Sequence, residues 1–193
     1  MSQNPSRATV RLFGVPASVT YRLDATEVER RRSAGLGSLA RLDLLDVLMG
    51  LPVGLPVQRA CLTEREQRLL RELPDGVVTE HDDQLVRRAV QPLTVHNAVV
   101  AARGWRTGLR KAGRFAPFCA RSVRLPQLPD DFEEVSVQAG FYGIGVLIGP
   151  PCRAEQLVAA QPYARHRHGP GHWWFAEEVF GQLGAVVEEG ALV

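Results

Sequence analysis

The sequence predicts an α/β protein in which a mixed central sheet is flanked by helices. Helical and strand-like hydrophobic periods alternate between residues 62 and 150, as expected for such a sheet. Turns rich in glycine and proline separate these segments, for example at residues 74–76 and 149–151. A hydrophobic content of 45% and a charged content of 23% are typical of a globular protein with a buried core.

Short strands and helices are expected before this core. Alternating apolar residues predict strands at residues 10–13 and 18–23. A charged helix should begin at residue 25 and continue through an apolar stretch to residue 49. Two prolines make residues 51–57 a loop or an edge segment, because proline cannot donate to a sheet ladder.

The first half of the core should contain one helix and three strands. The sequence TERE at residues 63–66 is a capping box, in which the Thr and Glu side chains bond each other's backbone amides. The helix that it begins should end near residue 73. Strands are then expected at residues 76–80, 84–90 and, more deeply buried, 95–102.

The second half of the core should alternate helices with strands. A tryptophan opens an amphipathic helix at residues 105–115, and its basic side chains share one face. A short strand is expected at residues 122–125. A helix with acids in its first turn follows at residues 132–139, and a buried strand at residues 143–148. An apolar helix at residues 172–183 should close the chain.

The chain length predicts one compact domain composed of three segments. These are N-terminal strands and helices at residues 1–61, an α/β core at residues 62–150, and a C-terminal extension with its closing helix at residues 151–193. No apolar run is long enough to span a membrane, and the start lacks a secretion signal. Three widely spaced cysteines are expected to be buried thiols of a reducing compartment. We therefore expect a cytoplasmic protein without a membrane partner.

Basic charge is concentrated in one stretch of the chain. The whole sequence has a net charge of +2, yet residues 84–129 hold nine basic residues and no acid. Arginine makes planar, bidentate contacts to phosphates and base edges, so this stretch predicts nucleic acid as the partner. The expected contacts are Arg87, Arg88, Arg103, Arg106, Arg110, Lys111 and Arg114. The same arginines could instead pair with the acidic residues of the rest of the chain.

Missing motifs exclude several enzyme classes. The only lysine, Lys111, lies outside a GxxxxGK[ST] sequence, which excludes P-loop nucleotide chemistry. GxSxG and HExxH are absent as well. Glu80, Asp82 and Asp83 are close enough in sequence to hold a divalent metal ion, although such a cluster is more often a solvated turn. Together with Lys111 they are the candidate catalytic residues of a metal-dependent phosphodiesterase.

A histidine cluster near the C-terminus is a second candidate metal site. His166, His168 and His172 are close in sequence, and neighbouring imidazoles can share a transition metal. The alternative is an exposed, pH-sensitive basic loop, which we favour because the cluster contains no cysteine or carboxylate. We expect no cofactor, with a divalent metal ion as the alternative.

Residues 103–126, RGWRTGLRKAGRFAPFCARSVRLP, resemble the core of PD-(D/E)XK (restriction-endonuclease-like) nuclease domains. In that family a buried strand precedes a tryptophan-headed helix, and a short strand follows. The helix and the GFYGIGVLI strand within residues 132–148 resemble the usual continuation. The resemblance covers roughly residues 62–150 and implies a restriction-endonuclease-like core. It also implies that residues 62–73 are the opening helix and residues 76–90 the first strands of the sheet.

The catalytic motif of that family is missing from this chain. Alignment on Trp105 places the positions of its Glu-x-Lys motif on Val99 and Ala101, which can neither bind a metal nor activate water. The resemblance therefore implies a degenerate nuclease fold that binds nucleic acid without cutting it. A bacterial restriction, repair or defence system is the context that it suggests.

A protein partner or a homodimer is the alternative from another functional class. Trp173, Trp174, Phe175 and Phe180 lie on the expected C-terminal helix, and tryptophan is frequent at the energetic centres of interfaces. The same aromatic side chains could instead close the protein core. We favour the core, because large apolar side chains on a helix are usually buried.

Overall fold

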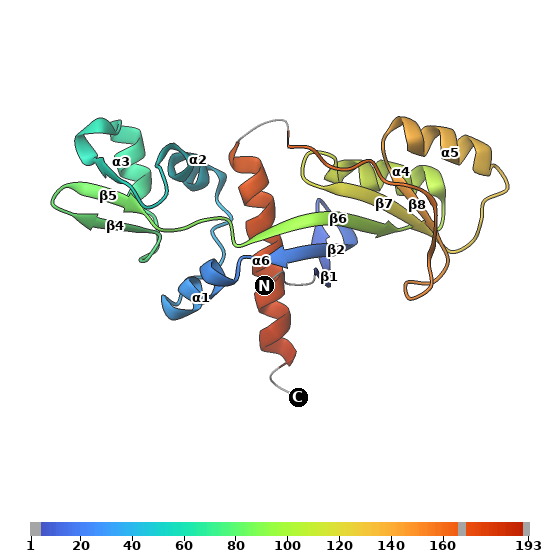
Figure 1. Cartoon of the computed structure of the whole chain (residues 1–193), viewed down its shortest axis with the longest axis horizontal. Helices are drawn as coiled ribbons and strands as arrows, with labels where there is room; N and C mark the ends of the chain where they lie inside the picture. Colours follow the sequence, from blue (N-terminus) through green and yellow to red (C-terminus); the bar gives the residue numbers. More distant parts are fainter. Residues whose placement is uncertain (1–4, 166–168, 191–193) are drawn as a thin grey trace. The chain divides into compact units, whose positions relative to one another are not determined.

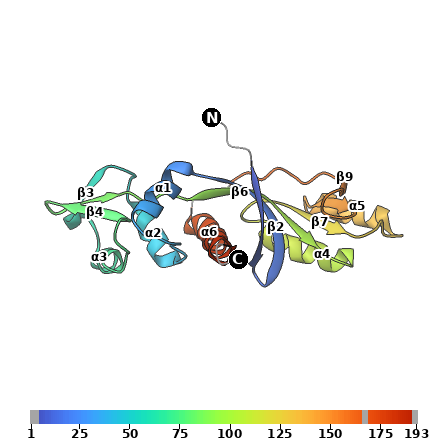
Figure 2. The ribbon, with the colours of Figure 1, turned by 90° about the horizontal axis from the view of Figure 1, so that it is seen from below.

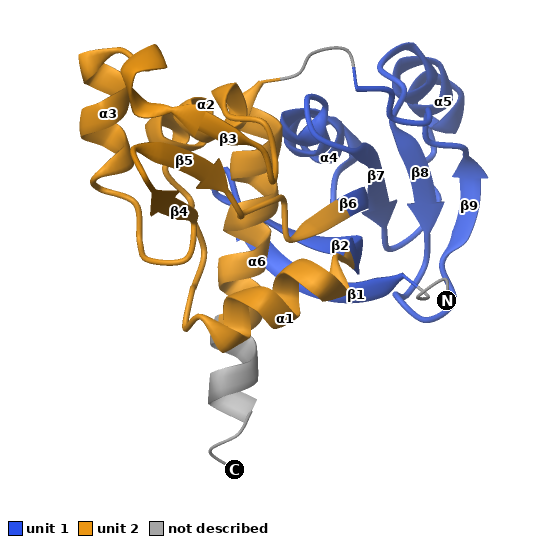
Figure 3. Cartoon of the chain, turned by 60° about the vertical axis from the view of Figure 1, so that its left-hand side comes forward, with its two compact units in different colours: residues 1–22, 95–166 blue, residues 23–94, 167–193 orange. Residues whose placement is uncertain are grey.

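The structure is a computed structural model that describes residues 5–165 and 169–190. It contains two compact units, each assembled from separate parts of the chain (Figures 1 and 3). Unit 1 comprises residues 1–22 and 95–166, and unit 2 comprises residues 23–94 and 167–193. The expected division of one compact domain into segments at residues 1–61, 62–150 and 151–193 stays a prediction.

A mixed six-stranded sheet, most of it in unit 1, confirms the predicted fold class. Its strand order is β1-β2-β6-β7-β8-β9. The strands are β1 (Ser6–Leu12), β2 (Val15–Leu23), β6 (Leu93–Ala101), β7 (Ala120–Leu125), β8 (Gly145–Ile148) and β9 (Glu155–Val158). β1 and β2 form an antiparallel hairpin, β6, β7 and β8 are parallel, and β9 runs antiparallel to β8.

Two helices of unit 1 cover one face of this sheet. α4 (Trp105–Ala112) connects β6 to β7 and packs on β7, and α5 (Phe132–Phe141) connects β7 to β8 and packs on β8. The short 3-10 helix η2 (Gly113–Phe115) continues α4. Crossovers between parallel strands are right-handed, and both of these step in the same direction along the sheet. Both helices therefore lie on the same side, as Figures 1 and 2 show.

β7 sends its side chains alternately to the two faces of the sheet. Val123 is fully buried and lies beneath Gly108 of α4. Arg121, two residues earlier, therefore belongs to the helix-covered face. Ser122 and Arg124 belong to the opposite face, which no described helix of unit 1 covers. The two arginines of β7 thus contribute to different surfaces.

The expectation about the first strands of the main sheet is wrong. The nuclease resemblance assigns residues 76–90 to them, but the neighbour of β6 is β2. Residues of this segment instead form β4 (Val78–His81) and β5 (Gln84–Arg87), which pair with β3 (Pro56–Gln58) in a three-stranded sheet of unit 2. β2 and β6 have nine residues each and match in length, whereas β4 and β5 have four each. The N-terminal hairpin therefore supplies the partner of β6.

Unit 2 combines the small sheet with several helices. They are α1 (Ala25–Ser33), α2 (Leu42–Gly50), η1 (Arg59–Cys61), α3 (Glu64–Leu70) and α6 (Pro170–Gly190). The predicted capping box is present, with the Thr63 amide donating to Glu66 at 2.8 Å. The expected continuous helix over residues 25–49 is wrong. Gly35 adopts a left-handed φ of 62°, which ends the first helix and separates it from α2.

α6 closes the core of unit 2. Trp173 and Phe175 are at most 3% exposed, and Trp173 packs in one cluster with Leu45 and Leu48 of α2. These two aromatic side chains therefore belong to the core, which is the alternative that we favour over an interface anchor. α6 has 21 residues, yet neither it nor any other described helix is long and apolar enough to cross a membrane.

A buried ion network connects α1 and α6 within unit 2. Arg31 is 1% exposed, and its two terminal nitrogens donate to Glu177 at 2.8 and 2.7 Å. Its Nε donates to Glu27 at 2.7 Å. Burial raises the pKa of Glu27, but hydrogen bonds from Arg30 and Arg31 outweigh it, so the pKa lies below its ordinary value. Each buried charge thus has a partner of opposite sign, which a buried charge requires.

The expectation of three buried cysteines is correct for one of them only. Cys61 and Cys152 are exposed, because they lie on the short segment η1 and on a surface turn. Cys119 is buried, and burial raises the pKa of its thiol to about 12. The reactive thiolate of Cys119 is therefore nearly absent at neutral pH.

We expect a thiol reagent to label two cysteines of the folded protein and the third only after denaturation. Mass spectrometry after labelling in buffer and in urea counts the modified residues. The Cys119→Ser variant should show two labels under both conditions. Rapid labelling of all three cysteines in the folded wild-type protein would contradict the burial of Cys119.

Candidate functional site

The positions that carry the nuclease motif in the resembled family lie in a concavity of unit 1. Val99 and Ala101 of β6 line it together with Asn97. Ala98 and Val100, which alternate with them, are buried on the opposite face of the strand. The sheet therefore places the motif positions on its open face, where a ligand can reach them.

This concavity, which we call the sheet-face site, has a volume of about 470 Å³. Arg7 and Thr9 of β1 lie opposite Thr20 and Ser18 of β2 in the hairpin register, and all four line the site. Arg124 of β7 also lines it. The described residues of its lining thus provide two guanidinium groups, three hydroxyls and two amides, but no carboxylate.

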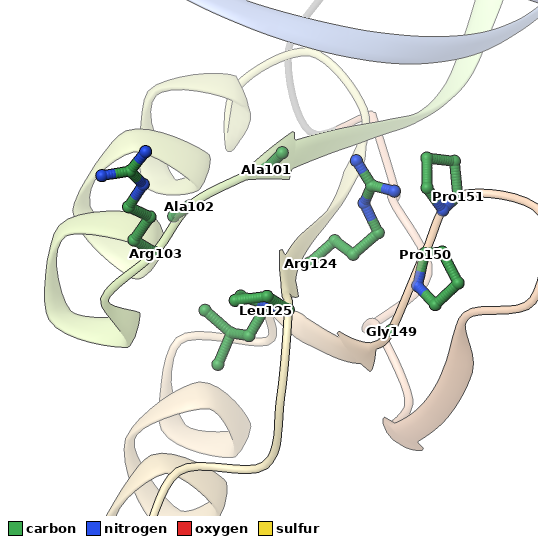
Figure 4. A pocket seen from close by; sticks show the side chains of 9 residues that line it. Ala101, Ala102, Arg103, Arg124, Leu125, Gly149, Pro150 and Pro151 are labelled. Atoms are coloured by element: carbon green, nitrogen blue, oxygen red, sulfur yellow. The ribbon is translucent and has the colours of Figure 1, made fainter.

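A second concavity of about 510 Å³ adjoins the sheet-face site at the ends of β6 and β7. It shares Ala101, Arg124 and Pro151 with that site and adds Arg103. Figure 4 shows the side chain of Arg124 between Ala101 and Pro151. Its lining, too, contains no carboxylate among the described residues. The two concavities form one basic surface around Arg124.

The polar groups of this surface lack partners within the part of the chain that the structure describes. The guanidinium groups of Arg7, Arg103 and Arg124 make no hydrogen bond and no ion pair there. The Oδ1 atom of Asn97, an acceptor and so not a contact for an anion, is buried and also has no hydrogen-bond partner among the described residues. Guanidinium groups form their strongest hydrogen bonds with anionic oxygens. An anionic ligand would therefore find donors that the fold itself does not use.

The sheet-face site has the chemistry of an anion-binding site and lacks the ligands of a catalytic metal site. Magnesium and calcium ions are held mainly by carboxylate and carbonyl oxygens, and no carboxylate lines the described part of the site. Elsewhere among the described residues, no group of three or more His, Cys, Asp or Glu side chains is placed to hold a metal ion. Arginine, in contrast, matches the geometry of phosphate oxygens.

Arg87, one of the predicted nucleic-acid contacts, is used by the fold of unit 2. Its guanidinium donates to the carbonyl oxygens of Leu48, Leu51 and Ala89 and lies 4.6 Å from the ring of Trp173. Burial lowers the pKa of Arg87. Because backbone oxygens occupy its donors, Arg87 serves the fold of unit 2 and does not present its guanidinium to a ligand.

Three other predicted contacts also have protein partners. Arg88, in unit 2, donates to a threonine hydroxyl at 3.1 Å. In unit 1, Arg106 donates to Glu134 of α5 at 2.9 Å. For this arginine the alternative, pairing with an acidic residue of the chain, is therefore correct. Arg114 donates to the carbonyl oxygen of Phe13 at 2.6 Å. These side chains are exposed, but part of their hydrogen-bonding capacity is used.

The remaining predicted contacts have no partner among the described residues. They are Arg103, Arg110 and Lys111, all in unit 1. Arg103 lines the concavity of Figure 4. Arg110 and Lys111 lie on α4, on the helix-covered side of the sheet. Only Arg103 therefore adjoins the sheet-face site.

The acidic cluster of Glu80, Asp82 and Asp83 lies on the β4–β5 hairpin of unit 2. Asp82 and Asp83 form its turn with left-handed φ values of 48° and 61°, and all three side chains are exposed. Arg59 pairs with Glu80 and lies 3.6 Å from Asp83. Lys111 belongs to unit 1. These three acidic residues thus form a solvated turn, the alternative that we favour over a metal site.

The candidate metal site of His166, His168 and His172 can be followed only in part, because the structure describes one of these three histidines. His166 and His168 lie outside the described residues. Nδ1 of His172 lies 3.4 Å from the amide oxygen of Gln91. The apolar context of its strand predicts His96 to be a hydrogen-bonded core histidine, with a catalytic role as the alternative, but His96 is exposed on β6, so the prediction of a core histidine is wrong.

Arg7 and Asn97 are the site residues that the sequence does not single out. Arg124 lies in the basic stretch, but not among its expected contacts. The alternation of polar with apolar residues along β1 and β2 is the signal that could have indicated an open polar face. That alternation does not tell which strand becomes the neighbour of β6, and the site depends on this pairing.

Comparisons with protein-family models, with curated proteins and with solved structures returned no match to this chain.

Proposed function

We propose that unit 1 binds nucleic acid at the sheet-face site and does not cut it. The supporting observation is the lining of this site, where Val99 and Ala101 stand at the motif positions between Arg7 and Arg124, without a described carboxylate. Hydrolysis of a phosphodiester with a metal ion needs several oxygen ligands and an activated water. Binding needs only donors and positive charge, which the arginines of this surface provide.

The backbone of the nucleic acid is the part that this site recognises. Arg7, Arg103 and Arg124 contact phosphate oxygens through charge-assisted hydrogen bonds. The hydroxyls of Thr9 and Ser18 and the amide nitrogen of Asn97, which also line the site, add neutral hydrogen bonds to the phosphate oxygens. Because phosphate contacts carry no base information, we expect affinity that depends strongly on salt and weakly on sequence.

The double variant Arg7→Gln, Arg124→Gln should weaken oligonucleotide binding about tenfold or more, because a hydrogen bond to a charged group contributes about 1.5–3 kcal/mol. Fluorescence anisotropy with labelled DNA and RNA measures the dissociation constants. Each lost arginine should also reduce the slope of log affinity against log salt concentration by about 1.

The matched control is Arg65→Gln, Arg68→Gln, which removes the same charge from exposed positions of α3 in unit 2. Its affinity should stay within about twofold of the wild-type value, as expected when only long-range charge is lost. An equal loss in both double variants would show that net charge, and not the sheet-face site, binds the nucleic acid. Absence of binding by the wild-type protein at low salt would refute the proposal outright.

A further inference from the structure

A third concavity of unit 1 lies on the helix-covered side of the sheet. Its volume is about 490 Å³, within the roughly 300–1,000 Å³ of small-molecule sites. Residues of α4, α5 and the start of β7 line it, and the buried side chains of Leu109 and Ile144 form an apolar part of its wall. We call it the α4–α5 pocket. It shares no lining residue with the sheet-face site.

Three arginines line the α4–α5 pocket, and no carboxylate does so among the described residues. Arg106 is paired with Glu134. Arg110 is exposed and makes no hydrogen bond or ion pair with a described residue. Arg121 donates one hydrogen bond, to the carbonyl oxygen of Tyr142 at 2.5 Å, while its buried Nε has no partner. Two guanidinium charges at this pocket are thus without a described counter-ion.

Arg121 is a partly buried cation without a described counter-ion. Desolvation by burial lowers the pKa of its guanidinium, and no described carboxylate compensates for the lost hydration. A partly buried cation with unused donors costs free energy that an opposite charge nearby would recover. Arg110, on the facing helix α4, would attract the same anion. The pocket is therefore suited to a compact group with one or two negative charges.

An aromatic rim adjoins these charges. Tyr142 lines the pocket and is 55% exposed, and Phe141 next to it is 83% exposed. Their rings meet edge to face with centroids 5.1 Å apart. The exposed faces of these rings are accessible to a ligand, and stacking of a nucleobase on such a ring contributes about 1–3 kcal/mol.

We infer that the α4–α5 pocket binds the phosphate monoester of a nucleotide, with the phosphate beside Arg110 and Arg121 and the base against the rim of Tyr142 and Phe141. The ligand is either a free mononucleotide or the phosphorylated end of a strand. Binding of a phosphorylated strand end rests on the proposed nucleic-acid binding by unit 1. Recognition of a monoester differs from that at the sheet-face site, which contacts the diesters of a backbone.

Calorimetric titration with adenosine monophosphate and with adenosine tests the inference. The monophosphate should bind the wild-type protein at least tenfold more tightly than adenosine. Arg110→Gln should lose most of that difference, since Arg110 has no described partner and its exchange leaves the fold intact. Tyr142→Leu should weaken the binding of both ligands, and the control Arg68→Gln should weaken the binding of neither.

A second arm compares oligonucleotides with a 5′-phosphate and with a 5′-hydroxyl. One outcome is that the wild-type protein prefers the 5′-phosphorylated strand, loses this preference in Arg110→Gln and fails to bind the free monophosphate. This combination of results assigns the pocket to strand ends. Binding of the free monophosphate by the Arg7→Gln, Arg124→Gln variant shows that the pocket acts independently of the sheet-face site, even if the proposed function fails. The inference is overturned if neither phosphate ligand is preferred, or if Arg110→Gln leaves the preference unchanged.

Discussion

Replacing Glu177 with alanine should lower the free energy of unfolding by about 3–5 kcal/mol, the range for removing one partner of a buried ion pair. Glu177 is fully buried, and its carboxylate accepts four hydrogen bonds within unit 2. Two come from Arg31, one from the Leu39 amide at 2.9 Å and one from Trp173 Nε1 at 2.8 Å. Alanine accepts none of them.

The loss is large because the donors stay buried after the substitution. Arg31 keeps Glu27 as a partner, but its two terminal nitrogens lose the Glu177 carboxylate. The Leu39 amide and the Trp173 indole are left without an acceptor, and each unsatisfied buried donor costs about 1–3 kcal/mol. Glu177 therefore stabilises α6 against α1 and the segment that follows it.

Urea unfolding monitored by circular dichroism measures this effect. The matched control is Glu178→Ala, which removes the same carboxylate from the neighbouring, only half-buried position of α6. The free energy of unfolding of this variant should change by no more than about 0.5 kcal/mol, as for an ordinary surface substitution. If Glu177→Ala and Glu178→Ala unfold at the same urea concentration, the described network does not stabilise unit 2.

The second large effect is expected for Gly108→Ala, which should destabilise unit 1 by about 1–3 kcal/mol through overpacking. A Cβ atom at Gly108 would lie 2.3 Å from Cγ2 of Val123 and 3.0 Å from Cβ of Ala102. Val123 is fully buried in β7, so it cannot turn away into solvent. α4 would have to move off the sheet, although alanine is otherwise the better helix former.

Thermal or urea unfolding of Gly108→Ala and of Gly113→Ala checks this packing. Gly113 follows α4 directly, and a Cβ atom there meets nothing within 4 Å. Gly113→Ala should therefore be neutral or slightly stabilising. Adding Val123→Ala to Gly108→Ala should restore part of the lost stability, because it removes the clashing methyl groups. A Gly108→Ala protein as stable as wild type would mean that α4 does not approach β7 so closely.

Much of the fold could be predicted because the decisive signals are local. The capping box at Thr63, the tryptophan that opens α4 and the alternation in β6 each lie within one element. The break at Gly35 is not predicted, because the charged and apolar stretches around it both favour a helix. The pairing of β2 with β6 depends on contacts between distant parts of the chain, which hydrophobic periodicity does not specify.

The candidate site was only partly predictable for the same reason. Positive charge in residues 84–129 was visible, but partners distant in sequence decide what each arginine does. Arg87 is occupied by carbonyl oxygens of unit 2, and Arg106 by an acid of α5. Arg7 lies far from the basic stretch and reaches the sheet-face site only through the β1–β2 register. Which arginines remain available therefore follows from tertiary structure alone.

Photo-cross-linking at Ala101 tests most directly whether nucleic acid lies on the open face of the sheet. Ala101 is exposed, lines both concavities around Arg124, and accepts a photoreactive side chain without disturbing a buried neighbour. Leu55, 60% exposed in unit 2, is the control position. We predict a cross-link to a labelled oligonucleotide from position 101, diminished by Arg7→Gln, Arg124→Gln, and none from position 55. Equal cross-linking from both positions, or none from position 101 under conditions where the protein binds the oligonucleotide, would contradict the sheet-face site.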